Sequence, residues 1–350
     1  MKGYSEYIGA IHIHTIYSDG TAAIPEIIEK ASEVGLNFLM FSDHHSLKPK
    51  IMGFEGWHGG VLVLIGYEIN DEEDKNHYLV FDMEEDISFP QRADAYVKKV
   101  NRMGGLGIVA HPDERRHNLE KYPPYPWTEW NLNELIIIEI WNQMSQWMEG
   151  LTRWNKVWRY MHPRSSLKTP TERTLRRWDG MNKFRKVVGV GGIDAHAHIY
   201  YLFNRIPLEI FPYKVQFKSI RTHIWTEKKL NEDVKFPECK EIIYSSIKNG
   251  RCFISNYRWG NAKGFKFWAE SGGSQFISGD TIARCERGVD FFVKLPEKAD
   301  IFLIKDGEKI YSNSGRDLYY RTDEGGIYRV EVLKKKRGWI YSNHMYLKYD

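Results

Sequence analysis

Short apolar runs alternate with amphipathic stretches along the first two thirds of the chain. Three stretches, 25–34, 91–103 and 237–248, have apolar residues at helical spacing, and glycine or Asn-Gly follows each of them. Strands that alternate with helices are typical of a parallel sheet or barrel, so the pattern predicts an α/β fold. The strand-like runs are residues 7–13, 37–42, 61–65, 78–81, 106–110, 135–140 and 187–190.

The pattern changes near residue 255. The runs 265–268, 291–295, 301–304 and 328–333 are short, rich in β-formers and separated by Gly, Asn and Asp. This spacing is typical of antiparallel strands joined by turns. We therefore expect two domains, an α/β domain over residues 1–254 and a small antiparallel β domain over residues 255–350.

Residues 113–186 are too long for an ordinary connection between a strand and a helix, and they are rich in tryptophan. Leu151, Trp154, Trp158 and Met161 recur at helical spacing, which favours a helix that packs on the barrel; a lid over an active site is the alternative. Between Trp141 and Asp179 there are eight Lys or Arg and three Asp or Glu, a local charge of +5. A solvated face is the usual explanation, and a rim that attracts anions is the other.

Composition narrows the class of protein only slightly. The net charge of +4 over 350 residues indicates no global preference for nucleic acid or membranes. The chain starts without the apolar run of a signal peptide, and its longest apolar stretch, 61–67, is far shorter than the roughly 18 residues of a membrane span. Cys239, Cys252 and Cys285 form no pair motif. We expect a cytoplasmic protein with no membrane partner.

Two histidines close the first strand-like run. Alternate side chains of a strand share a face, so His12 and His14 should point the same way and could bind one metal ion or two neighbouring ones. A His-x-His pair is common on polar surfaces, so by itself it is weak evidence for a metal site.

The same kinds of side chain recur at the ends of the other runs. A buried strand ordinarily ends in turn-forming residues, and parallel barrels place their chemistry at the C-terminal strand ends. The recurrence therefore predicts that these side chains converge in space. They are Asp43 and His44, Glu68, His111, Glu139 and Asn142, and Asp194 and His196, with Asp19 in a Ser-Asp-Gly turn after the first run and His77 at the start of the run 78–81.

The order of these motifs resembles the PHP (polymerase and histidinol phosphatase) superfamily. The resemblance covers residues 7 to about 250 and rests on H-x-H, S-D-G, S-D-H, G-x-E, H, A-H-P, E-x-W-N and G-x-D-A-H. It implies a distorted seven-stranded (β/α) barrel and a metal-dependent hydrolase, in which Glu68 bridges two metal ions. The implied metal ligands are His12, His14, Asp19, His44, Glu68, His77, His111, Asp194 and His196.

Two features depart from the phosphoesterases of that superfamily. Asn142 stands near a position where many of them have histidine, which leaves the occupancy of a third metal position open. The Glu-x-Trp-Asn motif and the β-rich tail instead resemble the branch that includes carbaryl-hydrolase-like enzymes. The bond cleaved could then be a carbamate, ester or amide.

The expected chemistry is hydrolysis by water activated at two or three divalent ions. Mixed His and carboxylate ligands suit Zn, Mn or Fe(II). The first hypothesis is a phosphoesterase acting on a small, anionic phosphorylated metabolite or nucleotide; the second is a carbamate, ester or amide hydrolase, and the third, less favoured, is a nucleic-acid-processing or nucleic-acid-binding protein. His198 is the first candidate for the general acid, Asn142 for orienting substrate or water, and Arg205, with Arg115 and Arg116, for stabilising negative charge.

Overall fold

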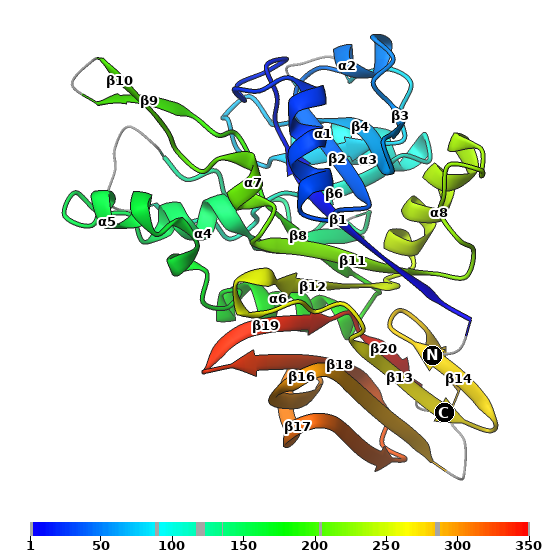
Figure 1. Cartoon of the computed structure of the whole chain (residues 1–350). Helices are drawn as coiled ribbons and strands as arrows, with labels where there is room; N and C mark the ends of the chain where they lie inside the picture. Colours follow the sequence, from blue (N-terminus) through cyan, green and yellow to red (C-terminus); the bar gives the residue numbers. More distant parts are fainter. Residues whose placement is uncertain are drawn as a thin grey trace.

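All seven strand-like runs of the first two thirds form strands in the computed structural model (Figure 1). The structure describes residues 3–87, 91–116, 123–134, 136–202, 205–283 and 288–348, so Leu135, at the start of one predicted run, and Cys285 lie outside it. The strands are β1 (Ser5–Ile13), β2 (Phe38–His44), β4 (Val61–Ile69), β5 (Tyr78–Phe81), β6 (Leu106–Val109), β7 (Ile137–Asn142) and β8 (Val188–Gly192).

These strands pair in chain order. β1 and β2, β2 and β4, β6 and β7, and β7 and β8 are parallel, whereas β5 is antiparallel to both β4 and β6. The segment after β8 returns to β1 through a bridge between Ile13 and Ala195, and His14 donates its backbone N–H to the Ala195 carbonyl at 2.9 Å. Because β5 runs the opposite way, its start lies beside the C-terminal ends of its neighbours. This explains why His77 precedes its strand while the other candidate ligands lie in the C-terminal part of a strand or in the segment that follows it.

Both faces of the central strands are buried. In β2, Leu39 and Phe41 belong to one apolar cluster, and Phe38 and Met40 belong to another, as the alternation of side chains along a strand requires. Helices α1 (Ile24–Glu33) and α3 (Ala93–Arg102) contribute to the first cluster, and α8 (Phe236–Lys248) contributes to the second. These are the three predicted helices, and the predicted α/β class is confirmed.

The tail continues the same sheet. β12 (Cys252–Asn256) pairs with β11 (Ile220–Thr226), which pairs with β1, and with β19 (Arg337–Ser342) of the tail. The boundary predicted near residue 255 thus falls inside a strand that hydrogen-bonds on both sides, although most of the tail has an apolar core of its own. Two predicted runs, 291–295 and 301–304, are parts of one irregular strand, β16 (Val289–Lys305). The remaining strands are β3 (Gly56–His58), β9 (Ile199–Leu202), β10 (Ile206–Glu209), β13 (Lys266–Ser271), β14 (Ser274–Ile277), β15 (Thr281–Ile282), β17 (Glu308–Thr322), β18 (Gly326–Lys334) and β20 (Met345–Leu347).

The tryptophan-rich stretch does not pack as predicted. Of the predicted stripe, residues 151–161, only the last part forms a helix, α5 (Lys156–Met161), and none of the residues of α5 is buried. Trp154, Trp158 and Met161 are 93%, 53% and 65% exposed, whereas Leu151 is buried with Trp147 and Phe211. The expected stripe fails because the chain turns between Leu151 and α5. The other short helices are α2 (Lys48–Ile51), α4 (Gln143–Glu149), α6 (Glu172–Asn182) and α7 (Tyr213–Gln216), with 3-10 turns at Pro163–Ser166 and Tyr257–Trp259.

Among the described residues, no helix has the length and apolar character that crossing a membrane would require.

Candidate metal centre

The end of β1 does not follow the simple alternation that the sequence predicts. His12 has a left-handed backbone with φ of 72°, the register with β2 shifts at this point, and His14 lies beyond the strand. The two rings nevertheless lie 5.1 Å apart. A bulge therefore aims both imidazoles into one space, which strict alternation was expected to do.

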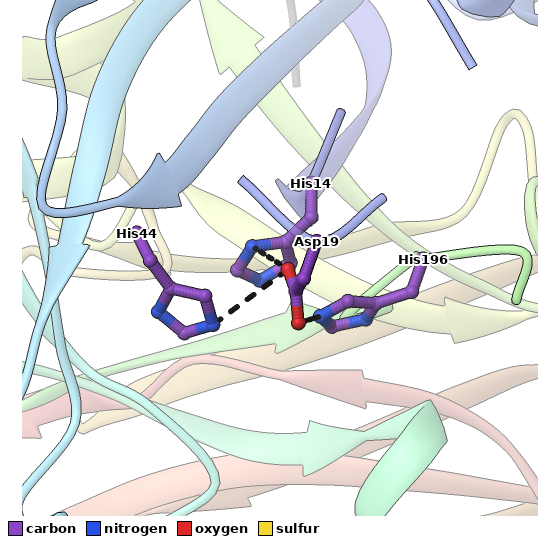
Figure 2. Close-up of side chains that lie close together, drawn as sticks. All are labelled: His14, Asp19, His44 and His196. Carbon is purple, nitrogen blue, oxygen red and sulfur yellow. Dashed lines mark ion pairs between the residues drawn. The ribbon is translucent and has the colours of Figure 1, made fainter. Parts of the chain in front are cut away.

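One group of candidate ligands comes from three separate segments (Figure 2). Asp19 lies between the rings, with one carboxylate oxygen 3.5 Å from His14 Nδ1 and 3.8 Å from His44 Nε2. Its other oxygen lies 3.2 Å from His196 Nε2. One potential ligand atom from each of these four residues lies within 4.8 Å of all the others.

Glu68 occupies the centre of the wider cluster and is 1% exposed. Its Oε2 lies 3.1 Å from His12 Nε2 and 3.2 Å from His14 Nε2. Its Oε1 lies 2.8 Å from His77 Nδ1 and 3.5 Å from His111 Nε2. His44 Nδ1 also lies 3.6 Å from Oε2, so the two carboxylate oxygens face different sets of histidines.

Asp194 completes a further group. Its Oδ1 lies 3.4 Å from His12 Nε2, 3.5 Å from His14 Nε2 and 3.5 Å from His196 Nδ1. His12, His14 and Asp194 form one compact set of potential ligand atoms, and His12, Glu68 and His111 form another. All nine side chains predicted as ligands are thus brought together.

Several of these residues have strained backbones. The backbone φ values are 72° at His12, 27° at His111 and 53° at Asp194, in a region that residues other than glycine rarely adopt. Such strain persists only where the surroundings fix it, and it concentrates at functional sites. Here it falls on residues that point into the cluster.

The protonation equilibria of the cluster are strongly coupled. Burial alone would lower the pKa of His14, but Asp194 and Glu68 outweigh it and raise the pKa to about 9. At His77, burial would also lower the pKa of the imidazole, but the charge of Glu68 outweighs it and raises that pKa to about 10. At His44 burial prevails and lowers the pKa to about 4. The pKa of Glu68 is held well below its usual value, since the surrounding histidines outweigh its burial.

Buried nitrogen atoms without hydrogen-bond partners support a metal in this space. His14 Nε2, His77 Nε2 and His111 Nδ1 are buried and make no hydrogen bond of suitable geometry, although His14 Nε2 lies 3.2 Å from Glu68 Oε2. Leaving a buried polar atom unpaired costs about 1–3 kcal/mol, so such atoms call for an explanation. An ion held at about 2.0–2.2 Å separates its ligands by up to about 4.4 Å, close to the spread within each group here. The donor set fits a transition metal.

Glu139 supports the cluster from outside. Its Oε1 lies 2.9 Å from His12 Nδ1, and its Oε2 accepts the backbone N–H of His111 at 2.8 Å. A histidine whose second nitrogen meets a carboxylate is fixed in tautomer and orientation, an arrangement common around metal ligands. Gly192 makes room for it, because a Cβ atom there would lie 1.8 Å from Glu139 Oε1.

Asn142 caps the helix that follows it. Its Oδ1 accepts the backbone N–H of Ser145 at 3.0 Å and caps α4, and its Nδ2 donates to Glu139 Oε2 at 2.7 Å. The structure therefore shows a helix cap that also steadies Glu139. Its second N–H and second lone pair are not used by these bonds, so a role in orienting substrate or water stays a prediction.

Two further supports were not predicted. Asp43 accepts hydrogen bonds from the Thr15 backbone and hydroxyl and from the Ser18 hydroxyl, each at 2.7 Å, and so holds the loop that carries Asp19. Tyr213 donates to the carbonyls of His14 and His196, at 2.8 Å and 3.1 Å. The sequence pattern placed Asp43 among the converging side chains without this role, but nothing in the sequence marks Tyr213, which lies some 200 residues from His14.

His198, the predicted general acid, lies beside the cluster, whereas Arg205, predicted to stabilise negative charge, lies away from it. The ring of His198 lies 5.0 Å from that of His196, on the exposed side of the cluster. Arg205 is exposed in the turn between β9 and β10, a hairpin that projects from the body of the molecule (Figure 1). The structure does not bring Arg205 into the cluster, because this hairpin leads away from it.

A different arginine approaches the cluster. Arg116 forms an ion pair with buried Glu114, and its guanidinium carbon lies 5.1 Å from the centre of the Tyr125 ring. Tyr125 in turn stacks on His77, with ring centres 5.0 Å apart. A cation is thus held one aromatic layer away from a candidate ligand.

Comparison with known proteins gave weak similarities. No protein-family model matches the chain, and no curated protein matches it significantly. Among solved structures, it is similar to a two-domain protein from Bacteroides vulgatus containing a predicted PHP-like metal-dependent phosphoesterase, with 12% identity, a TM-score of 0.47, and coverage of 98% of this chain and 96% of the other.

Two other solved structures are similar over shorter spans. PsfC from Pseudomonas syringae has 13% identity and a TM-score of 0.42, over 67% of this chain and 87% of PsfC. A candidate metal-dependent phosphoesterase from Bifidobacterium adolescentis has 15% identity and a TM-score of 0.34, over 54% of this chain and 87% of the other. These values are too low to assign the chain to a family, so its function has to be argued from the side chains of the site.

Proposed function

We propose that this protein is a metal-dependent phosphoesterase of the PHP type that hydrolyses a small phosphorylated molecule. The observation that carries the proposal is the set of overlapping ligand groups around Glu68 and Asp194. Nine His, Asp and Glu side chains are more than one ion can use, and their motifs follow the PHP order. We also interpret β1, β2 and β4–β8 as the distorted barrel of that superfamily, and the tail as its accessory β domain.

The geometry suggests how the ligands are divided. His14, Asp19, His44 and His196 would hold one ion, and His12, Glu68 and His111 another. Asp194 lies within 3.5 Å of histidines from both sets, and His77 contacts Glu68 at 2.8 Å. The His and carboxylate donors are those that Zn, Mn and Fe(II) accept.

Ions held in these positions would lower the pKa of a nearby water and withdraw charge from the oxygen atoms of the substrate. The residues of the chain provide the geometry. Glu139 fixes the orientation of His12, and Asp43 fixes the loop of Asp19. The Asp19 side chain is 48% exposed, whereas that of Glu68 is 1% exposed, so substrate approaches from the side of Asp19.

One side chain at the rim suits a remaining step. His198, exposed next to His196, can deliver a proton to the leaving group. Arg116, behind Tyr125 and His77, is ion-paired with buried Glu114, so its charge does not discriminate between a phosphoester and a neutral carbamate or amide.

A substrate panel tests the proposal. Purified protein reconstituted with Mn²⁺ or Zn²⁺ should hydrolyse p-nitrophenyl phosphate or bis-p-nitrophenyl phosphate, and chelation should abolish the activity. Asp194→Asn, which keeps the shape of the side chain, is the matched inactive control. Turnover of a naphthyl carbamate without turnover of either phosphate would refute the phosphoester assignment, and degradation of single-stranded oligonucleotides alone would refute a small substrate.

A further inference from the structure

A cavity lies away from the metal cluster, where α5 and the 3-10 turn after it meet α7 and the turn that follows β12. Its volume is about 340 Å³, within the range of small-molecule sites. None of the candidate metal ligands lines this cavity. The lining consists of Tyr160, Met161, His162, Pro163, Arg164, Pro212, Val215 and Arg258.

The charged lining of this cavity is entirely basic. Arg164 and Arg258 both face it, His162 adds an imidazole, and no carboxylate is among the lining residues. Neither arginine forms an ion pair with a carboxylate in the part of the chain that the structure describes. The connecting segment 150–171 contains five Lys or Arg and no Asp or Glu, so there is also no acidic neighbour in sequence.

The two guanidinium groups line one cavity despite their like charges. Burial, and then the neighbouring charge of Arg258, lower the pKa of the Arg164 side chain. Arg164 is half-buried and donates through Nη1 to the Lys218 carbonyl at 3.0 Å, which leaves its other donors available. Arg258 lies over the Trp259 ring, with its guanidinium carbon 5.4 Å from the ring centre. Paired guanidinium groups without an acid are typical of sites for phosphate or carboxylate.

The rest of the lining is apolar. Met161 is 65% exposed, and Pro163, Pro212 and Val215 complete a wall beside the arginines. We propose that this cavity binds a small organic anion, whose phosphate, phosphonate or carboxylate group meets Arg164 and Arg258 while its apolar part contacts Met161 and Val215. Because Pro212 and Val215 flank Tyr213, which bonds the His14 and His196 carbonyls, the same short helix faces both sites.

Phenylphosphonate, which has a dianionic group and an apolar ring and cannot be hydrolysed as an ester, is a suitable probe. We would titrate it calorimetrically into the metal-loaded full chain. The Asp194→Asn variant should still bind phenylphosphonate at the cavity, since binding there does not depend on the metal cluster. Arg164→Gln and Arg258→Gln should each weaken it about tenfold or more, the effect of losing a charged hydrogen bond. Metal content should not change in these two variants.

The matched control is Lys168→Gln, which removes an exposed charge from the same segment without touching the cavity. It should leave binding unchanged, and Val215→Trp should abolish binding by filling the space. Equal weakening in Lys168→Gln and Arg258→Gln would mean diffuse attraction and overturn the proposal, as would unchanged binding in both arginine variants. Arginine-dependent sedimentation with phosphatidylglycerol vesicles, without binding of phenylphosphonate, would overturn it in favour of a lipid surface.

Discussion

Two of the buried clusters of charged and titratable residues in the described part of the chain differ in how many of their atoms lack hydrogen-bond partners. In the cluster around Glu68, several buried histidine nitrogens have no hydrogen-bond partner. In the second cluster, Arg329 of β18 donates to both carboxylate oxygens of Asp179 on α6, at 2.6 Å and 2.8 Å, and also to Glu331 at 2.8 Å. His344 contacts the same Asp179 at 2.7 Å.

The difference separates a candidate functional site from a structural one. The Asp179 cluster is closed, because a bidentate Arg–carboxylate pair satisfies its charges within the protein. It ties the tail to the preceding α/β region. The Glu68 cluster is open, since several of its rings with unpaired nitrogens converge on one space. His344 Nδ1 also has no partner, so the two clusters differ in how many unpaired ring nitrogens come together, and not in whether one exists.

The largest effect should come from Glu68→Gln. The loss of the central carboxylate charge should remove metal and lower hydrolysis by more than about 100-fold, since even partners outside the ligand shell cost about 10–100-fold. Metal analysis and initial rates measure both. Circular dichroism should show an intact fold, and near wild-type metal content would mean that the cluster is not the metal site.

Arg329→Met should have the opposite profile. It leaves Asp179 buried without its cation, which should lower the free energy of unfolding by about 3–5 kcal/mol. Metal content per folded molecule should stay at the wild-type level. Chemical denaturation measures the first quantity, and Arg316→Met, at an exposed position, should change it by less than about 0.5 kcal/mol. Loss of metal from folded Arg329→Met protein would contradict the separation of the two clusters.

Glu139→Gln tests the border of the open cluster. It removes the charge that orients His12, so metal affinity should fall about 10–100-fold with little change in stability. Competition with a fluorescent chelator gives the affinity. An unchanged affinity would show that His12 needs no such support.

The closed cluster should also respond to pH through His344. Burial lowers the pKa of His344 more than Asp179 raises it, so the unfolded chain binds more protons than the folded one as pH falls below about 6.5. Stability should therefore decrease as pH falls below about 6.5, by at most about 1.4 kcal/mol per pH unit for this one group. The difference between wild type and His344→Gln isolates the effect, and parallel pH profiles would refute it.

The smallest effect is expected at Asn142. Asn142→Ala removes the cap of α4 and should cost about 1 kcal/mol of stability. Asn142→Asp keeps the cap but places a second charge beside Glu139, so it should preserve more of the stability and weaken metal binding. If both variants bind metal as wild type does, Asn142 acts on the helix alone.

The sequence allowed the cluster to be predicted because its residues stand at strand ends, and parallel neighbours bring such ends together. Even there, the physical reason was partly different: a bulge, and not alternation, aligns His12 with His14. The roles of Tyr213 and Asp179 could not be predicted. Each depends on partners some 150 to 200 residues away, and no local pattern encodes such contacts.

At the exposed tryptophans, the sequence pattern predicted a burial that the structure does not show. Leu151, Trp154, Trp158 and Met161 have the spacing of a buried helical stripe, yet only Leu151 is buried. Periodicity tells which residues would share a face of a helix. It does not tell where the helix begins, and the turn before α5 rotates the later residues into solvent.

The pairing of Asp179 with Arg329 also bears on how the chain is made. The two residues are 150 positions apart, so at about 5–20 residues per second the ribosome adds the arginine some 8–30 s after the aspartate. During that interval α6 carries a carboxylate whose burial has no compensating cation. A newly made chain would therefore keep this helix undocked until β18 has emerged, which gives chaperones a defined window in which to bind it.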